Sequence, residues 1–157
     1  MENMNWCKKQ KKGIRIIEPN LDIANGYLKM AVDSIGTMNR EKDKNLIFSV
    51  SAGYYCIYYS LYAIMQKLGF KCEIHSCSIK FVKLFLNEFY SKEDFDLMNR
   101  SFSLRNNFQY YVNKEFNKED LSFLWNNAYG FYVKSREVLL RLNEIKIKEI
   151  RERFENE

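Results

Sequence analysis

The sequence predicts an all-α protein, built as an up-and-down bundle of four to five helices. Its 157 residues include one proline and six glycines, too few for the many tight turns of a β protein. Apolar residues instead recur at spacings of three and four, the period of an amphipathic helix. A hydrophobic share of 46% with 29% charged residues is the balance of a globular chain, and the length fits one domain.

The first helix is predicted to begin after Pro19, with Asn20 as its N-cap. Its apolar stripe, with spacings of three and four, consists of Leu21, Ala24, Leu28, Ala31, Ile35 and Met38. A polar and charged segment, residues 39–45, should end this helix.

The second helix is predicted over residues 47–68 and should be the centre of the bundle. An apolar stripe is joined there by an aromatic face of tyrosines, from Tyr54 to Tyr62, so the helix is apolar on most sides. It is long enough to span a membrane, but its polar side chains favour burial in a bundle. Gly69 should end it in a left-handed conformation. We interpret the tyrosines as core or dimer interface, with a base-stacking platform as the alternative.

The second half of the chain should hold the remaining helices. Ser76 or Ser78 is the predicted cap of a third helix. Ser91 and Asp94 resemble a capping box that opens a fourth. The last helix is predicted as one element over residues 118–153. Its second half should project into solvent, because glutamates there precede lysines or arginines by four positions.

Residues 1–18 are predicted to form a basic arm in front of the helical domain, residues 19–153. The first 17 residues carry a net charge of +4, so the other 140 are near neutral at +1. Such a body lacks the basic face that duplex DNA requires. We interpret the arm as solvated, with non-specific attraction to a polyanion as the alternative.

The four cysteines show no C-x2-C pair, and no segment near the start resembles a signal peptide. We therefore expect free thiols, a cytoplasmic location and no membrane association. Cys72, His75 and Cys77 lie close in sequence, but they offer at most three ligands in a spacing unlike a structural zinc site. We predict no metal and no cofactor. His75, the single histidine, should serve as a loop or cap residue, with a displaced catalytic base as the alternative.

Arg105 is the unusual residue of the fourth helix, because it falls on the apolar stripe. A guanidinium on a buried seam is costly unless it meets a carboxylate, a phosphate or a partner subunit. Two interpretations stay open. Arg105 either binds a phosphate or forms an ion pair between helices or subunits.

Four segments together resemble the HEPN superfamily, in particular its short stand-alone prokaryotic members. They are residues 51–62 (SAGYYCIYYSLY), 68–71 (LGFK), 73–76 (EIHS) and 104–112 (LRNNFQYYV). The last occupies the place of the superfamily's Arg-x4-6-His motif. The resemblance covers residues 20–150, nearly the whole chain.

The resemblance implies a homodimer and a ribonuclease-type activity. Many relatives are metal-independent ribonucleases, including toxins paired with a minimal nucleotidyltransferase or another antitoxin. In active members the arginine holds the scissile phosphate, and the histidine is the acid or base for attack by the ribose 2′-hydroxyl. Both roles suit the chemistry of these side chains.

This sequence keeps Arg105 and Asn106, but Tyr110, Tyr111 and Val112 fill the histidine positions. The ordinary pKa of a tyrosine is about 10, so tyrosine is a poor base at neutral pH, although it can donate a proton. We predict Arg105 and Tyr110 as catalytic residues, and Arg105, Asn106, Gln109 and Tyr111 as substrate-binding residues.

The predicted function is RNA or phosphate binding with weak or absent ribonuclease activity, in a toxin–antitoxin or defence pair. The alternatives are a non-catalytic adaptor or neutralising module, and a nucleotide-binding helical bundle. The missing histidine, the near-neutral body and an aromatic share of 16% favour the adaptor. The nucleotide-binding alternative has no such support, because the sequence contains no glycine-rich phosphate loop.

Overall fold

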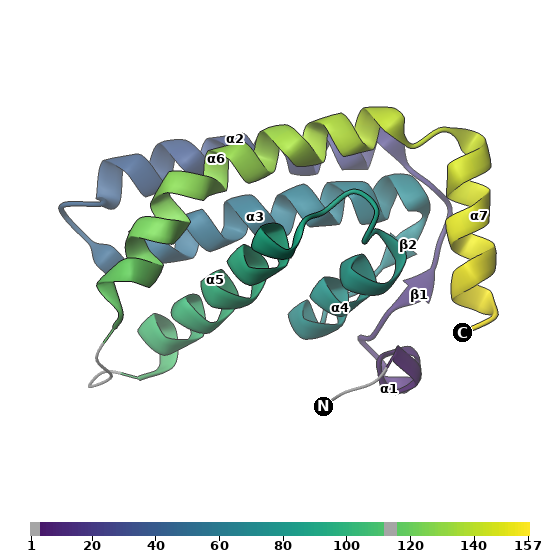
Figure 1. The fold of residues 1–157 in the computed structure, drawn as a ribbon, viewed down its shortest axis with the longest axis horizontal. Helices are drawn as coiled ribbons and strands as arrows, with labels where there is room; N and C mark the ends of the chain where they lie inside the picture. The colour runs from purple at the N-terminus through teal and green to yellow at the C-terminus, as the bar shows by residue number, and fades with distance from the viewer. Residues whose placement is uncertain (1–3, 112–115) are drawn as a thin grey trace.

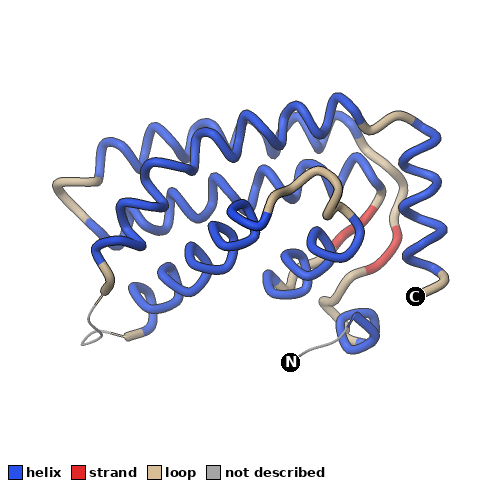
Figure 2. Tube along the Cα trace, viewed as in Figure 1, coloured by secondary structure: helices blue, strands red, loops and turns tan. Residues whose placement is uncertain are grey.

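The computed structural model describes residues 4–111 and 116–157. Helix accounts for 77% of it, in seven helices, with one two-stranded antiparallel ribbon (Figures 1 and 2). The all-α prediction is therefore confirmed. Four long helices run up and down beside one another, and the shorter elements gather at one end of the bundle (Figure 1).

The first two long helices form an antiparallel pair, α2 (Leu21–Glu41) and α3 (Leu46–Leu68). Asn20 caps α2 as predicted, since its side-chain oxygen accepts the amide of Ile23 at 2.9 Å. Asn45 caps α3 in the same way, through the amide of Phe48 at 3.2 Å.

Helix α3 is the centre of the core, as its sequence predicts. Seventeen of its 23 residues are buried. Gly69 ends the helix with φ of 79°, a left-handed conformation that glycine adopts without steric cost. Gly53 allows close approach, because a Cβ there would lie 2.8 Å from the Met38 sulfur and 3.0 Å from Leu124 Cγ. On the tyrosine-rich face, Tyr54, Tyr58 and Tyr62 are buried, while Tyr55 and Tyr59 are half-buried.

Helices α4 (His75–Phe85) and α5 (Lys92–Tyr110) follow the short strand β2 (Phe70–Lys71). Ser91 and Asp94 form the predicted capping box of α5. The predicted serine caps of α4 are wrong, because the helix already begins at His75, before either serine, and no side chain caps it. The predicted end of the fourth helix at Val112 lies outside the described residues.

The predicted single last helix is wrong. The chain forms α6 (Lys118–Arg141) and then α7 (Glu144–Glu155), because Leu142 and Asn143 are extended and Asn143 caps the second helix through the amide of Lys146. Helix α7 turns back across the end of the bundle instead of projecting (Figure 1). Its Ile150 and Phe154 are 0% and 5% exposed.

The basic N-terminal segment is not a solvated arm over the residues that the structure describes. It forms α1 (Met4–Lys9) and strand β1 (Arg15–Ile16), which pairs antiparallel with β2. Met4 and Ile14 are each 3% exposed. These apolar residues are interspersed among lysines, so their burial could not be recognised from periodicity.

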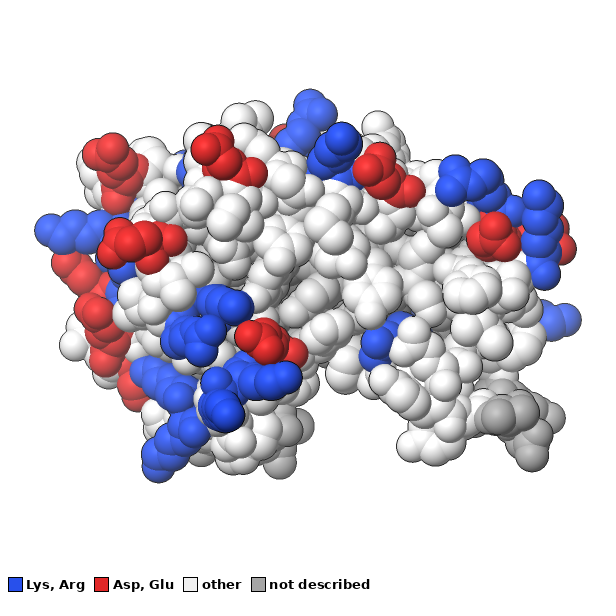
Figure 3. All heavy atoms as spheres, turned by 180° about the vertical axis from the view of Figure 1, so that it is seen from behind, with Lys and Arg blue, Asp and Glu red and all other residues white. Residues whose placement is uncertain are grey.

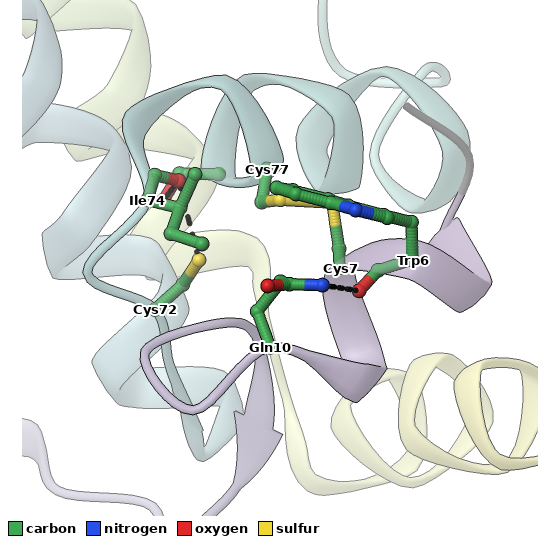
Figure 4. Close-up of a disulfide and its surroundings, with 7 residues drawn as sticks. Trp6, Cys7, Gln10, Cys72, Ile74 and Cys77 are labelled. Carbon is green, nitrogen blue, oxygen red and sulfur yellow. Dashed lines mark hydrogen bonds between the residues drawn. A yellow bond between two sulfur atoms is a disulfide. The ribbon is translucent and has the colours of Figure 1, made fainter. Parts of the chain in front are cut away.

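A disulfide joins Cys7 of α1 to Cys77 of α4, across 70 residues of sequence (Figure 4). The expectation of four free thiols is therefore wrong, although Cys56 and Cys72 are free and buried. The pairing depends on α1 folding against α4, which the cysteine spacing does not encode. The cytoplasmic location stays a prediction, and it loses the support of free thiols. Within residues 4–111 and 116–157, no helix combines the length and the apolarity needed to cross a membrane.

Candidate anion-binding site at Arg105

Arg105 lies on α5 where this helix crosses α3, and its side chain is half-buried. Its Nη2 donates to the Tyr55 hydroxyl at 3.2 Å, and its Nη1 donates to the Asn106 side-chain oxygen at 3.0 Å. Both acceptors are neutral. The guanidinium is therefore held in place by groups that do not compensate its charge.

The Nε of Arg105 is buried and has no hydrogen-bond partner. Among the residues that the structure describes, no carboxylate forms an ion pair with this arginine. A buried donor left unsatisfied costs about 1–3 kcal/mol, and more when it is charged. The interpretation of Arg105 as an intramolecular ion pair therefore finds no support, and the guanidinium retains the capacity to bind an anion.

Three tyrosine rings surround the guanidinium. Its central carbon lies 5.7 Å from the Tyr54 ring and 5.8 Å from each of the Tyr55 and Tyr110 rings. These contacts are within the range of cation–π attraction. Tyr110 is 66% exposed, so one wall of the site opens to solvent.

On the buried side of the site, Tyr54 connects Arg105 to α4. Its hydroxyl and Nδ1 of His75 share a hydrogen bond of 2.6 Å, and His75 also stacks on Tyr58 with ring centroids 3.9 Å apart. Burial, and then the positive charge of Arg105, lower the pKa of His75 to about 4. Burial raises the pKa of Tyr54 above its usual range. At neutral pH this pair is a neutral imidazole bonded to a neutral phenol.

Only some of the site residues predicted from the sequence contact Arg105 among the described contacts. Asn106 and Tyr110 contact Arg105, while Gln109 donates to Ser51 of α3 at 3.4 Å. Tyr111 lies just beyond the end of α5 and is 59% exposed.

Sequence reasoning missed Tyr54 and Tyr55 as site residues, and it treated His75 mainly as a loop residue. One signal was available, because a tyrosine buried in the central helix must find a partner for its hydroxyl. The sequence could not identify that partner, since the contact depends on how α3 and α4 pack.

A groove of about 810 Å³ begins beside Tyr55 and Gln109 and runs between α2 and α3. Its walls include apolar side chains that reach the surface, with Met30, Ile47 and Phe48 exposed by 45%, 47% and 61%. In the view from behind, uncharged atoms cover most of the centre of the molecule and charged groups lie mainly towards its edges (Figure 3). Tyr55 lines the groove and also accepts a hydrogen bond from Arg105, so the groove adjoins the Arg105 site.

No cluster of three or more His, Cys, Asp or Glu side chains suited to a metal ion occurs in the described part of the chain. In the segment that contains Cys72, His75 and Cys77, Cys77 forms the disulfide, and the Cys72 thiol donates to the carbonyl of Ile74 at 3.3 Å.

In class, the chain is a helical bundle with a half-buried arginine, in an aromatic and polar site, whose charge no described carboxylate compensates. Compared with models of known protein families it matches none, and no curated protein sequence matches it. The chemistry of the site therefore has to be argued from its own residues.

Proposed function

We propose that this protein is a HEPN-like RNA-binding protein whose Arg105 site holds a phosphate, with weak or absent metal-independent ribonuclease activity. The observation that carries the proposal is a guanidinium with a buried, unpartnered Nε and no carboxylate among the described residues. Arginine binds phosphate through several parallel hydrogen bonds, so a phosphodiester would supply the negative charge that no described carboxylate gives to this half-buried guanidinium.

The surrounding tyrosines favour RNA over a free phosphate. Tyr110 is exposed and Tyr55 half-buried, and aromatic rings beside a cation are the usual platform on which unpaired bases stack. A phosphate on Arg105 would place neighbouring bases within reach of these rings.

Cleavage by this site would be slow. Attack by a ribose 2′-hydroxyl forms a cyclic phosphate and releases a 5′-hydroxyl, so one group must take a proton and another must give one. His75 is neutral and can take a proton, but its Nδ1 is engaged by Tyr54. Tyr110 can give a proton yet is a poor base near neutral pH. Loss of a well-placed acid or base removes about 10²- to 10⁴-fold of rate.

The proposed working form is a homodimer in which a second copy occupies the groove between α2 and α3. Exposed apolar side chains such as Phe48 line that groove, and Tyr55 belongs both to it and to the Arg105 site. A second copy seated there would bring two arginines towards a shared cleft. Light scattering that finds only monomers at micromolar concentration would remove this part of the proposal.

Binding of a fluorescent single-stranded RNA, with and without Arg105→Ala, tests the main proposal. We expect a loss of about 10- to 100-fold in affinity, because hydrogen bonds to a charged group contribute about 1.5–3 kcal/mol. Arg136→Ala is the matched control, since Arg136 is exposed on α6 and its removal changes the net charge equally. Equal affinities for the two variants would refute the Arg105 site. Analysis of the RNA products in EDTA tests for residual metal-independent cleavage. The His75→Gln variant tests whether His75 takes part in it.

A second candidate function is a non-catalytic partner of another protein, such as a nucleotidyltransferase or another antitoxin or toxin. The same groove favours it, because exposed apolar patches commonly mark protein contacts. Arg105→Ala and Phe48→Glu together separate the two candidates. Under the second, Phe48→Glu should abolish the complex with the partner protein and Arg105→Ala should leave it intact, whereas under the first Arg105→Ala should weaken RNA binding.

A further inference from the structure

The folded N-terminal segment and α4 build a basic surface at one end of the bundle. Residues 4–17 and 70–85 together carry eight lysines and arginines against one acidic residue, Glu73. Since the whole chain has a net charge of +5, the rest of it is net negative at −2. The cationic character of the protein is therefore concentrated in these two segments.

Three contacts bring the two segments to the same place. The disulfide fixes α1 against the first turn of α4, β1 pairs with β2, and the Glu73 amide donates to the Lys12 carbonyl at 2.9 Å. Seen from behind, Lys and Arg side chains gather over this corner, at the lower left of Figure 3. Lys9, Lys11 and Lys12 are exposed.

This basic corner is linked to the Arg105 site through a short chain of buried contacts. Arg105 lies over Tyr54, and Tyr54 bonds His75, the first residue of α4. Two residues further along α4, Cys77 is bonded to Cys7, which directly precedes Lys8 and Lys9. Residues 75–77 of α4 and the disulfide therefore connect the tyrosine-lined site to the segment that carries the lysines.

We propose that this corner, formed by Lys9, Lys11, Lys12 and the neighbouring cations, binds the phosphodiester backbone of the RNA whose phosphate lies on Arg105. The inference rests on the proposed function and extends it with a path for the strand. Several surface lysines attract a polyanion by releasing its counterions, which gives affinity with little sequence preference. Arg105 and its tyrosines then hold one nucleotide of that strand.

The test is a salt titration of binding to a fluorescein-labelled oligouridine of about 20 nucleotides, longer than the usual site of a small binding domain. The triple variant Lys9→Gln, Lys11→Gln, Lys12→Gln should bind at least about tenfold more weakly at low salt. The slope of log K against log salt should fall by about 2, since each phosphate contact on a single strand contributes about 0.7. Lys29→Gln, Lys44→Gln, Lys92→Gln is the matched control, because these lysines are exposed elsewhere on the molecule.

Each outcome supports or overturns the inference. Equal losses for the two triple variants would indicate diffuse attraction and overturn it, as would an unchanged slope for the first. Vesicles of phosphatidylcholine with phosphatidylserine provide a second arm. Lysine-dependent binding to these vesicles without binding to RNA would also overturn the inference.

The Arg105→Ala variant separates this inference from the proposed function. If Arg105→Ala weakens binding but the lysine variant does not, the Arg105 site stands and the basic surface falls. If only the lysine variant weakens binding, the surface stands as an RNA contact without the Arg105 site. Matching circular dichroism melting curves for all variants would show that each one folds.

Discussion

Two half-buried arginines lie at different points along α3, and neither forms an ion pair with a described carboxylate. At the C-terminal end of α3, Nη1 of Arg151 donates to the carbonyls of Ile17, Leu68 and Gly69 at 3.0, 3.0 and 3.1 Å. Beside the middle of α3, the acceptors of Arg105 among the described residues are two neutral side chains, and its Nε has no partner there.

The role of a half-buried cation depends on the groups that surround it. The carbonyls at a helix C-terminus carry partial negative charge, so Arg151 is compensated by the backbone and its role is structural. Arg105 is placed by tyrosines, which attract a cation but do not neutralise it. A compensated arginine should matter for stability, and an uncompensated one for binding.

The largest effect on stability is expected from Arg151→Ala. This change removes the Arg151 donor from the carbonyls of Ile17, Leu68 and Gly69, of which Gly69 keeps the amide of Ile17. It should lower the free energy of unfolding by about 2–4 kcal/mol. Urea unfolding followed by circular dichroism measures the loss, and Arg151→Lys should recover part of it. A change below about 0.5 kcal/mol would contradict the structural role. RNA affinity at a temperature where the variant is folded should be unaffected.

Next in size is Tyr54→Phe, which removes the hydroxyl that bonds His75. The imidazole would be left without its buried partner, at an expected cost of about 1–3 kcal/mol in the free energy of unfolding. Tyr55→Phe is the control, because Tyr55 is half-buried and water can replace its hydroxyl. We expect it to cost less than about 1 kcal/mol. Similar losses for both variants would argue against a distinct Tyr54–His75 pair.

The sequence predicted those parts of the fold that depend on neighbouring residues. The caps Asn20 and Ser91, the glycine after α3 and the buried central stripe are all local patterns, and each is confirmed. The break at Asn143 is also local, but it was missed because the favourable charge spacing continues across it.

The site was only partly predictable, for a different reason. Arg105 was recognised because a charge interrupts an apolar stripe, which is visible in one dimension. Its partners Tyr54 and Tyr55 come from another helix, 51 and 50 residues earlier, and the disulfide from a segment 70 residues from its partner. Such contacts follow from packing angles between helices, which residue spacing does not specify.

The pH dependence of stability should centre on His75. Its pKa is about 4 in the folded protein and about 6.5 in an unfolded chain. Between these values the unfolded chain takes up a proton that the folded protein does not, so stability should fall as the pH decreases from 6.5 to 4. His75→Gln removes this component, while the carboxylates titrate in both proteins. Parallel urea-unfolding profiles for the two proteins across this range would contradict the assignment.

The smallest effect on stability is expected where the effect on binding is among the largest. Arg105→Met keeps the unbranched apolar stem and removes the charge together with the unpartnered Nε. Replacing a poorly compensated buried charge by an apolar group of similar size is often neutral or stabilising, so the free energy of unfolding should stay equal or rise by about 1 kcal/mol. RNA affinity should nevertheless fall as far as in Arg105→Ala. If the methionine variant unfolds more readily instead, the guanidinium is stabilised by its tyrosines, and Arg105 is a structural residue like Arg151. A gain in stability with a loss of binding would indicate that this position is kept for its ligand, because sites of function commonly tolerate a local cost in stability.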